Sequence, residues 1–364
     1  MPGRAPTYGS YLQLDLLLAA QNPPDYERLE PSEAPSARTR PLLHHDELLF
    51  IVVHQAYELW FKLILHELSR ARDLLGRVAP HKPTTVDERD VPEIVHTLER
   101  VNEVLRLAVD QFGVIETMTP LSFLAFRDAI TPASGFQSVQ FREVEILLGA
   151  DEARRAVAQG VFDGLLSRGE AERLRARLDE TTLKDALLDW LGRTPIRRAY
   201  PEFAAEFAAA FDAYCDDQAR RHAANPYAPP SERTAAAERA RAAKAAARAY
   251  VLEGDPIAVR ANQAFLFITT YREEPLLRWP ALLLDRLVEF EQRFRAFRFR
   301  HARMVERMIG ARTGTGGSSG VDYLDRGSQQ RIFGNLLEAR NFLLDRARLR
   351  DLPHPEVFRF RFEG

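Results

Sequence analysis

The sequence predicts an all-α protein, and three observations support that prediction. Apolar residues recur at helical spacing through most long stretches, no stretch sustains an alternation of apolar and polar residues, and proline or glycine marks the ends of the apolar stretches. A chain of 364 residues is long enough to bury a large core. We therefore expect a multi-helix bundle.

Composition and charge narrow the class of protein. Hydrophobic residues make up 46% and charged residues 28%, as in soluble globular proteins, and the net charge of −2 favours neither nucleic acid nor an anionic membrane. Cys215 is the single cysteine, which excludes an internal disulfide and fits a reducing cytoplasm. Asp15 breaks the first apolar run, so we expect no signal peptide. Glu58 and Lys62 interrupt the apolar residues 48–65, so we expect no membrane span.

The N-terminal region divides into two parts. Residues 8–20 have tyrosines and leucines at helical spacing and predict a short helix within a segment that covers residues 1–20. Residues 21–43 contain five prolines and predict an extended linker. Two tyrosines near a terminus are more often packing residues than functional ones.

Residues 44–76 give the strongest helix prediction. The stretch is apolar almost all round, which is typical of a central buried helix, and Gly76 can end it. Phe50, His54 and Glu58 are spaced four apart and share one face. His54 is either a core histidine satisfied by a backbone group or a neutral imidazole presented to a ligand N–H.

Residues 88–116 predict a second long helix, which contains Glu93-x-x-His96. This spacing is half of a di-iron carboxylate signature, which needs two such motifs and two further glutamates. The sequence shows no second Glu-x-x-His. A solvated helix face is therefore the preferred interpretation.

Thr119-Pro120 marks a helix start, with threonine as N-cap and proline at the first helical position. In the short helix that follows, Phe123, Arg127 and Ile130 share a face. A guanidinium among apolar residues needs an anionic partner. A distant protein carboxylate and a substrate carboxylate held by the planar fork are the two alternatives.

The middle of the chain predicts helices of less specific character. Residues 139–200 are helical without a usable motif, and residues 213–255 predict a helical insertion. Within it, residues 234–250 are rich in alanine and basic. Binding of nucleic acid or a partner is conceivable, but a solvated helix is the preferred interpretation.

The C-terminal third predicts two helices over residues 257–310 and a last amphipathic helix over 322–348. His301 lies in an apolar helical stripe, and Gly310 ends its helix before a glycine-rich loop at 314–320. The loop lacks the lysine and the strand–helix context of a nucleotide-binding loop. His301 is either a core histidine or an axial ligand to a flat apolar cofactor such as haem.

Several separated motifs resemble the tryptophan 2,3-dioxygenase family and cover most of the chain. They are YxxYLxLxxLL from Tyr8, HDELLFIVVHQ from His45, MTPxxFxxFRxxIxPxSGFQSxQFR from Met118, AFLFITTYREEP from Ala264, and His301 followed by GTGGSSG. The resemblance implies a helical domain, formed by residues 44–212 and 256–364, that encloses haem b. It also implies a homotetramer in the cytoplasm.

The resemblance assigns roles to individual residues. His301 is expected to ligate the haem iron, with Ser134 and Phe112 beside the haem. The residues expected to hold L-tryptophan are Phe50, Phe123 and Ile130 around the indole, His54 at its N–H, Arg127 at its carboxylate, and Gly314 with Thr315 at its amino-acid end. Tyr8, Tyr11 and Leu12 are expected to complete the site of a neighbouring subunit.

The implied reaction is cleavage of the indole C2–C3 bond of L-tryptophan by O2, which yields N-formyl-L-kynurenine in tryptophan catabolism by the kynurenine pathway. Phe123 and Phe112 stand where some members of the family have tyrosine and tryptophan, respectively, and both exchanges keep the pocket apolar. The linker at 21–43 is longer than the family's usual one, and the region 213–255 departs from the shorter members.

Three alternatives remain open to the sequence. The nearest is a biosynthetic haem oxygenase that acts on a substituted tryptophan or inserts one oxygen atom. A di-iron helical protein is disfavoured by the missing second Glu-x-x-His motif. The third alternative is a non-catalytic helical interaction protein.

Overall fold

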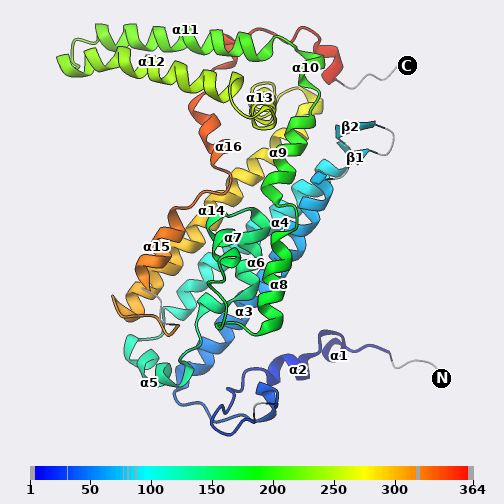
Figure 1. Cartoon of the computed structure of the whole chain (residues 1–364), viewed down its shortest axis with the longest axis vertical. Coiled ribbons are helices and arrows are strands. Elements are labelled where there is room, and N and C mark those ends of the chain that lie inside the picture. The colour runs from blue at the N-terminus through cyan, green and yellow to red at the C-terminus, as the bar shows by residue number, and fades with distance from the viewer. Residues whose placement is uncertain are drawn as a thin grey trace. The chain divides into compact units, whose positions relative to one another are not determined.

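Helices account for nearly all regular structure in the computed structural model, which describes residues 5–30, 32–76, 78–79, 82–86, 88–316 and 320–359 (Figure 1). The all-α prediction is confirmed. The three longest described helices are α3 (His45–Gly76), α4 (Val91–Ile115) and α14 (Arg278–Ile309). The remaining helices with α geometry are α1 (Tyr8–Leu12), α2 (Leu14–Ala19), α5 (Pro120–Ile130), α6 (Val139–Leu148), α7 (Asp151–Ala158), α8 (Arg168–Leu178), α9 (Leu183–Arg193), α10 (Ile196–Ala199), α11 (Phe203–Ala224), α12 (Pro230–Leu252), α13 (Pro256–Thr270), α15 (Val321–Gln329) and α16 (Gly334–Glu338).

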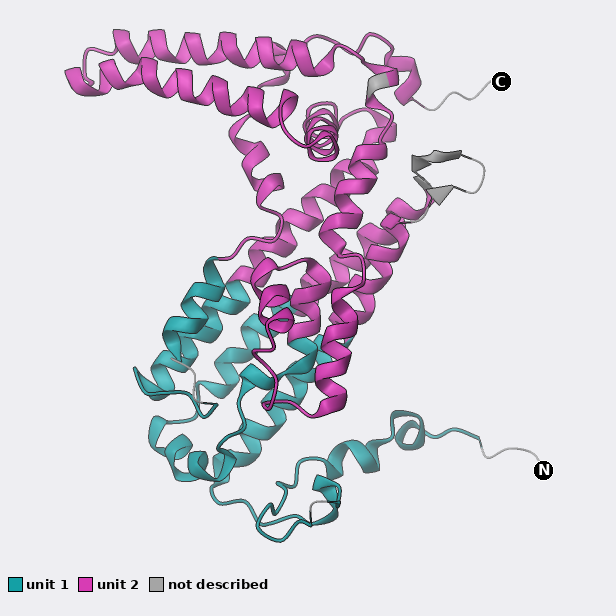
Figure 2. Ribbon diagram, viewed as in Figure 1, with its two compact units in different colours: residues 1–62, 105–141, 296–329 teal, residues 63–104, 142–295, 330–364 magenta. Residues whose placement is uncertain are grey.

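The chain forms two compact units, each assembled from stretches that lie far apart in the sequence (Figure 2). Unit 1 comprises residues 1–62, 105–141 and 296–329. Unit 2 comprises residues 63–104, 142–295 and 330–364. Every residue for which the sequence predicts a role in the site belongs to unit 1.

The core of unit 1 beside α14 is aromatic. The Phe112 ring lies 5.2 Å from the Tyr57 ring and 5.3 Å from the Phe297 ring, measured between centroids. Phe61 packs against Phe141 at 5.2 Å. The hydroxyl of Tyr57 is satisfied because it donates to the carbonyl of Ala108 at 3.1 Å. These contacts join α3, α4 and α14 around one apolar cluster.

Local signals start and stop the helices of unit 1 where the sequence predicts. Thr119 caps α5 by accepting the N–H of Ser122 at 3.1 Å, and Pro120 occupies the first turn. Gly310 follows α14 with φ of +58°, a conformation that glycine adopts at little cost. The loop that carries Gly314 and Thr315 therefore begins directly after the His301 helix.

Two predicted helices are interrupted. The expected helix over 8–20 is broken at Gln13, which has φ of +52° and separates α1 from α2. The expected helix over 322–348 is wrong as a single helix, because it stops after α15 and resumes as the short α16. The Glu291 carboxylate accepts the N–H groups of Ile332 at 3.0 Å and Phe333 at 2.7 Å, which withdraws those donors from a continuing helix.

Helices α11 and α12 of unit 2 run side by side as a long hairpin (Figure 1). Lys244 of the basic, alanine-rich stretch pairs with Asp216 at 2.5 Å, and Arg248 pairs with Asp212. Arg239 donates to the backbone carbonyl of Glu232, so three of the four basic residues in this stretch serve contacts inside the hairpin. This pairing favours a structural role for α12 over a surface that binds nucleic acid.

A short antiparallel ribbon between α3 and α4 is the only sheet in the described part of the chain. Strand β1 (Val78–Ala79) pairs with β2 (Lys82–Val86), with Val78 opposite Val86. In the described part of the linker predicted over 21–43 lie a 3-10 turn, Pro35–Ala37, and a bridge between Pro24 and Thr39. Helix α3 is long and apolar enough to cross a bilayer by composition, a test that core helices of soluble proteins also pass.

Candidate functional site

An aromatic wall forms where α3 and α5 meet in unit 1. The Phe50 ring lies 4.0 Å from the His54 imidazole, 5.8 Å from Phe123 and 5.6 Å from Phe126, between centroids. The structure thus brings together three residues predicted for the indole end: Phe50, His54 and Phe123. Phe126 was not among the predicted site residues, although its spacing of three from Phe123 places both on neighbouring parts of α5. Phe126 is 1% exposed and packs against both Phe50 and Phe123.

The environment of His54 fixes both its charge and its tautomer. Nδ1 lies 2.7 Å from the carbonyl oxygen of Phe50, and a carbonyl can only accept, so Nδ1 carries the hydrogen and Nε2 keeps a lone pair. Burial lowers the pKa of His54 below its ordinary value of 6.5, against the opposing effects of this hydrogen bond and of the Glu58 charge. His54 therefore presents a neutral acceptor atom near pH 7.

Arg127 has a protein partner that the sequence did not predict, a neutral backbone carbonyl. Its Nη2 donates to the backbone carbonyl of Thr313, and the side chain is half-buried rather than enclosed in an apolar wall. The partner is neutral, and no carboxylate of the described residues pairs with the guanidinium. The remaining donors of the fork can still bind an anion.

The loop after α14 lies directly against the segment that follows α5. Thr315 donates its hydroxyl to the carbonyl of Ala133 at 2.6 Å. A Cβ placed on Gly316 would lie 2.7 Å from the Cβ of Ser134, so glycine is required for this close approach. The structure thereby places Thr315 near Ser134 and, through Thr313, near Arg127. Residues 317–319 of the glycine-rich motif lie outside the described residues.

His301 is a half-buried imidazole on α14 with aromatic neighbours. Its ring stacks on Phe112 at 5.8 Å with an interplanar angle of 14°, and Phe297 lies 6.4 Å away. Next to it in sequence, Arg300 pairs with Glu116 at 2.6 Å, which joins α14 to the end of α4. Phe112, which the sequence also predicted to lie beside the haem, is 1% exposed and packs against the imidazole of His301.

The set of donor groups fits a haem better than a bare metal ion. Across the described ranges, no group of three or more His, Cys, Asp and Glu side chains is arranged to hold a metal. A porphyrin already provides four nitrogen ligands to its iron, so the protein needs to provide one imidazole and an apolar environment. His301 and Phe112 can provide these. Glu93 and His96 form no such site: Glu93 pairs with Arg70 at 2.7 Å, and His96 lies 3.7 Å from Glu99 on an exposed face.

The N-terminal site residues do not pack into the core of their own chain. Tyr8 is 78% exposed, Tyr11 is 79% exposed and Leu12 is 43% exposed. Neither α1 nor α2 has a buried residue. At its end the segment contacts α3, where Gln21 donates to the side chain of Gln55 at 2.7 Å.

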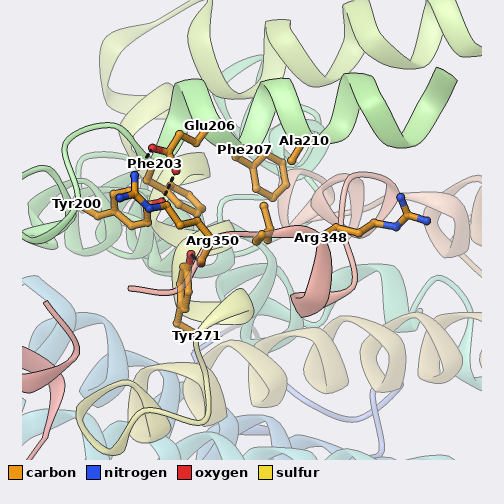
Figure 3. A pocket seen from close by; sticks show the side chains of 9 residues that line it. Tyr200, Phe203, Glu206, Phe207, Ala210, Tyr271, Arg348 and Arg350 are labelled. Carbon is orange, nitrogen blue, oxygen red and sulfur yellow. Dashed lines mark hydrogen bonds and ion pairs between the residues drawn. The ribbon is translucent and has the colours of Figure 1, made fainter. Parts of the chain in front are cut away.

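A pocket of about 200 Å³ lies in unit 2 between α11 and the C-terminal segment (Figure 3). None of the predicted site residues lines it. Its acid, Glu206, accepts from Tyr200 and pairs with Arg350 at 3.2 Å, while Tyr271 donates to the carbonyl of Arg350 at 2.9 Å. Its polar groups are thus engaged with one another, and Figure 3 shows Arg348 pointing away from Glu206.

The fold and the site define an all-α protein with a neutral imidazole in an aromatic wall and a second imidazole in a separate apolar stripe. The family model described as tryptophan 2,3-dioxygenase matches residues 3–343. The chain belongs to the tryptophan 2,3-dioxygenase family, a family of oxidoreductases.

Individual relatives are similar over nearly their whole length. The tryptophan 2,3-dioxygenase of Sorangium cellulosum is 38% identical, over 98% of this chain and 88% of the relative. Tryptophan 2,3-dioxygenase 2 of Ralstonia nicotianae is 40% identical, over 93% of each chain. The tryptophan 2,3-dioxygenase of Dictyostelium discoideum is 33% identical, over 95% of this chain and 86% of the relative.

Proposed function

We propose that this protein is a haem-dependent dioxygenase that cleaves the indole C2–C3 bond of L-tryptophan with O2 and yields N-formyl-L-kynurenine. Membership of the family supports this function. The observation in the structure that carries the proposal is the Nε2 acceptor of His54 beside the Phe50 ring, which itself lies 5.8 Å from the Phe123 ring. An indole needs both a flat apolar wall and an acceptor for its N–H. The reaction belongs to tryptophan catabolism, in the kynurenine pathway.

Haem b is the proposed cofactor, with His301 as its protein ligand. Phe112 would support the imidazole from below, and Ser134 would face the haem from the segment after α5. Haem, when bound, supplies the activation of O2. The chain's own side chains then contribute orientation of the substrate and a dry pocket.

The proposed substrate contacts divide between two ends of the site. Phe50, Phe123 and Ile130 enclose the indole, and His54 accepts its N–H. Because indole N–H is a very weak acid, His54 need not act as an obligatory base. Arg127 binds the carboxylate through the donors that Thr313 does not use. Thr315 and the Gly314 backbone hold the amino-acid end.

The protein is proposed to act as a homotetramer in the cytoplasm, with no membrane or nucleic-acid partner. Tyr8, Tyr11 and Leu12 would complete the site of a neighbouring subunit. Their exposure supports this role, because side chains of this size gain hydrophobic free energy only when a surface covers them. Three more leucines of the same segment are exposed: Leu16, Leu17 and Leu18.

One experiment tests the proposal directly. The haem-reconstituted protein is mixed with L-tryptophan and ¹⁸O₂, and the product is analysed by mass spectrometry. We expect N-formyl-L-kynurenine with both labelled oxygen atoms. A product that carries one labelled atom would indicate a monooxygenase, and the absence of a haem spectrum or of product would contradict the proposal.

A further inference from the structure

Glu58 lies one turn after His54 on the same face of α3, and a single neighbouring segment donates a hydrogen bond to each of its two carboxylate oxygens. Ser138 donates its hydroxyl to Oε1 at 2.6 Å. Gln140 donates its amide to Oε2 at 2.8 Å and to the backbone carbonyl of Glu58 at 2.8 Å. Three hydrogen bonds therefore fasten the segment 138–140 to the helix that carries His54.

The segment 138–140 directly follows residues 134–137, which contact the 313–316 loop. Four residues before Ser138, Ser134 caps a 3-10 turn by accepting the N–H of Phe136 at 3.3 Å, and its own N–H is accepted by the side chain of Gln137 at 3.1 Å. Gly316 lies directly on Ser134. The order of contacts is thus α3, then 134–140, then the loop that carries Gly314 and Thr315.

We propose that Glu58 is a positioning residue that fixes the distance between His54 and the 313–316 loop, and thereby selects ligands with both an indole and an amino-acid end. The inference rests on the proposed function of the site and extends it to a residue that does not touch the substrate. Two ends of one small ligand can be satisfied together only if their protein partners are held within the separation that the ligand can span. Glu58 supplies the connection that holds them.

A carboxylate suits this position because both of its partners on the segment, the Ser138 hydroxyl and the Gln140 amide, donate to it. Glutamine would keep one acceptor oxygen for Ser138 but would turn an NH₂ group toward the NH₂ group of Gln140. Glu58→Gln keeps the size of the side chain and removes its charge and one acceptor. Ser138→Ala removes the other hydrogen bond of the carboxylate, so the proposal can be tested even if one variant folds poorly.

The experiment compares two ligands on the haem-loaded protein by isothermal titration. L-tryptophan spans both ends of the site, whereas 3-methylindole has only the indole end. We expect Glu58→Gln to lower the affinity for L-tryptophan about tenfold, since a lost charge-assisted hydrogen bond changes affinity on that scale. The affinity for 3-methylindole should stay within about twofold of that of the unaltered protein. Steady-state kinetics should show the loss mainly as a higher KM.

Further variants complete the design. Ser138→Ala should show the same preference for weakening the binding of L-tryptophan. The double variant should lose less than the two single losses combined, because both substitutions loosen the same connection between α3 and the segment 138–140. Lys62→Gln serves as the matched control, since Lys62 lies one turn beyond Glu58 on α3 and is exposed. It should bind both ligands as the unaltered protein does.

The outcomes separate this inference from the proposed function. An equal loss of affinity for both ligands would show that Glu58 only stabilises the fold. No loss of affinity for either ligand would show that Glu58 does not position the site. Either result would overturn the inference while unaltered protein still binds L-tryptophan. If the unaltered, haem-loaded protein binds no L-tryptophan, the proposed function fails and the inference falls with it.

Discussion

Nδ1 of His54 lies 2.7 Å from the backbone carbonyl oxygen of Phe50, one turn earlier on α3. This contact turns a residue with two possible tautomers into one with a defined acceptor at Nε2. It also places that acceptor beside the Phe50 ring, whose centroid is 4.0 Å from the imidazole. The backbone carbonyl of Phe50 therefore determines that Nε2 of His54 is the atom that can accept a hydrogen bond from a ligand N–H.

Protonation of His54 should abolish its acceptor function. Burial holds the pKa of His54 below 6.5, so the affinity for L-tryptophan should be highest above pH 6.5 and should fall at lower pH as Nε2 gains a proton. The unfolded chain takes up the proton first, so His54 also makes stability fall as the pH drops from 6.5 toward the folded-state pKa. Titration calorimetry against pH measures the affinity. The acid limb should be missing in His54→Ser, and its persistence there would assign it to another group.

Arg127→Ala should reduce kcat/KM for L-tryptophan by about a hundredfold, which corresponds to roughly 3 kcal/mol for a lost charge-assisted clamp. Arg127→Lys should recover little, because an ammonium cannot both contact the Thr313 carbonyl and present a planar fork. Tryptamine lacks the carboxylate, so it should be a poor substrate that barely responds to the substitution. An equal loss for both substrates would show that Arg127 acts only by holding the Thr313 loop.

His301→Ala should fold but bind haem weakly, because it removes the one imidazole that the stripe on α14 offers to iron. Haem titration followed by absorption spectroscopy measures the loss, and circular dichroism checks the fold. His96→Ala is the matched control, since His96 lies on an exposed face of α4 and should leave haem binding unchanged. A normal five-coordinate ferrous histidine spectrum in His301→Ala would rule out the assignment.

Removal of residues 1–20 should weaken the binding of L-tryptophan more than the binding of haem, since the deletion takes away Tyr8, Tyr11 and Leu12 but leaves α14 intact. Analytical ultracentrifugation gives the oligomeric state, and titration gives the two affinities. A fully active monomer without these residues would contradict the proposed exchange between subunits.

Gly316→Ala should destabilise the protein by about 1–3 kcal/mol, because its new methyl group would lie 2.7 Å from the Cβ of Ser134 and would push the loop away. Chemical denaturation measures the change. Gly169→Ala is the control: a Cβ there meets nothing within 4 Å on helix α8, so stability should be unchanged or slightly higher. Equal stability of the Gly316→Ala variant and the unaltered protein would show that the loop can move aside.

The sequence by itself determined the helical class and most helix positions. The periodicity of apolar residues, the Thr119-Pro120 start and the Gly310 stop are local signals, and local hydrogen bonding decides whether they take effect. The same is true of the shared face of Phe50, His54 and Glu58, which follows from helical spacing alone.

The tertiary structure decided the contacts that the sequence could not specify. Arg127 meets the carbonyl of Thr313, a residue 186 positions away, and no local pattern encodes such a pairing. Glu291 ends the expected C-terminal helix from 41 positions away by capturing the N–H of Ile332. Backbone groups look alike in every sequence, so only the folded chain shows which of them a given side chain reaches.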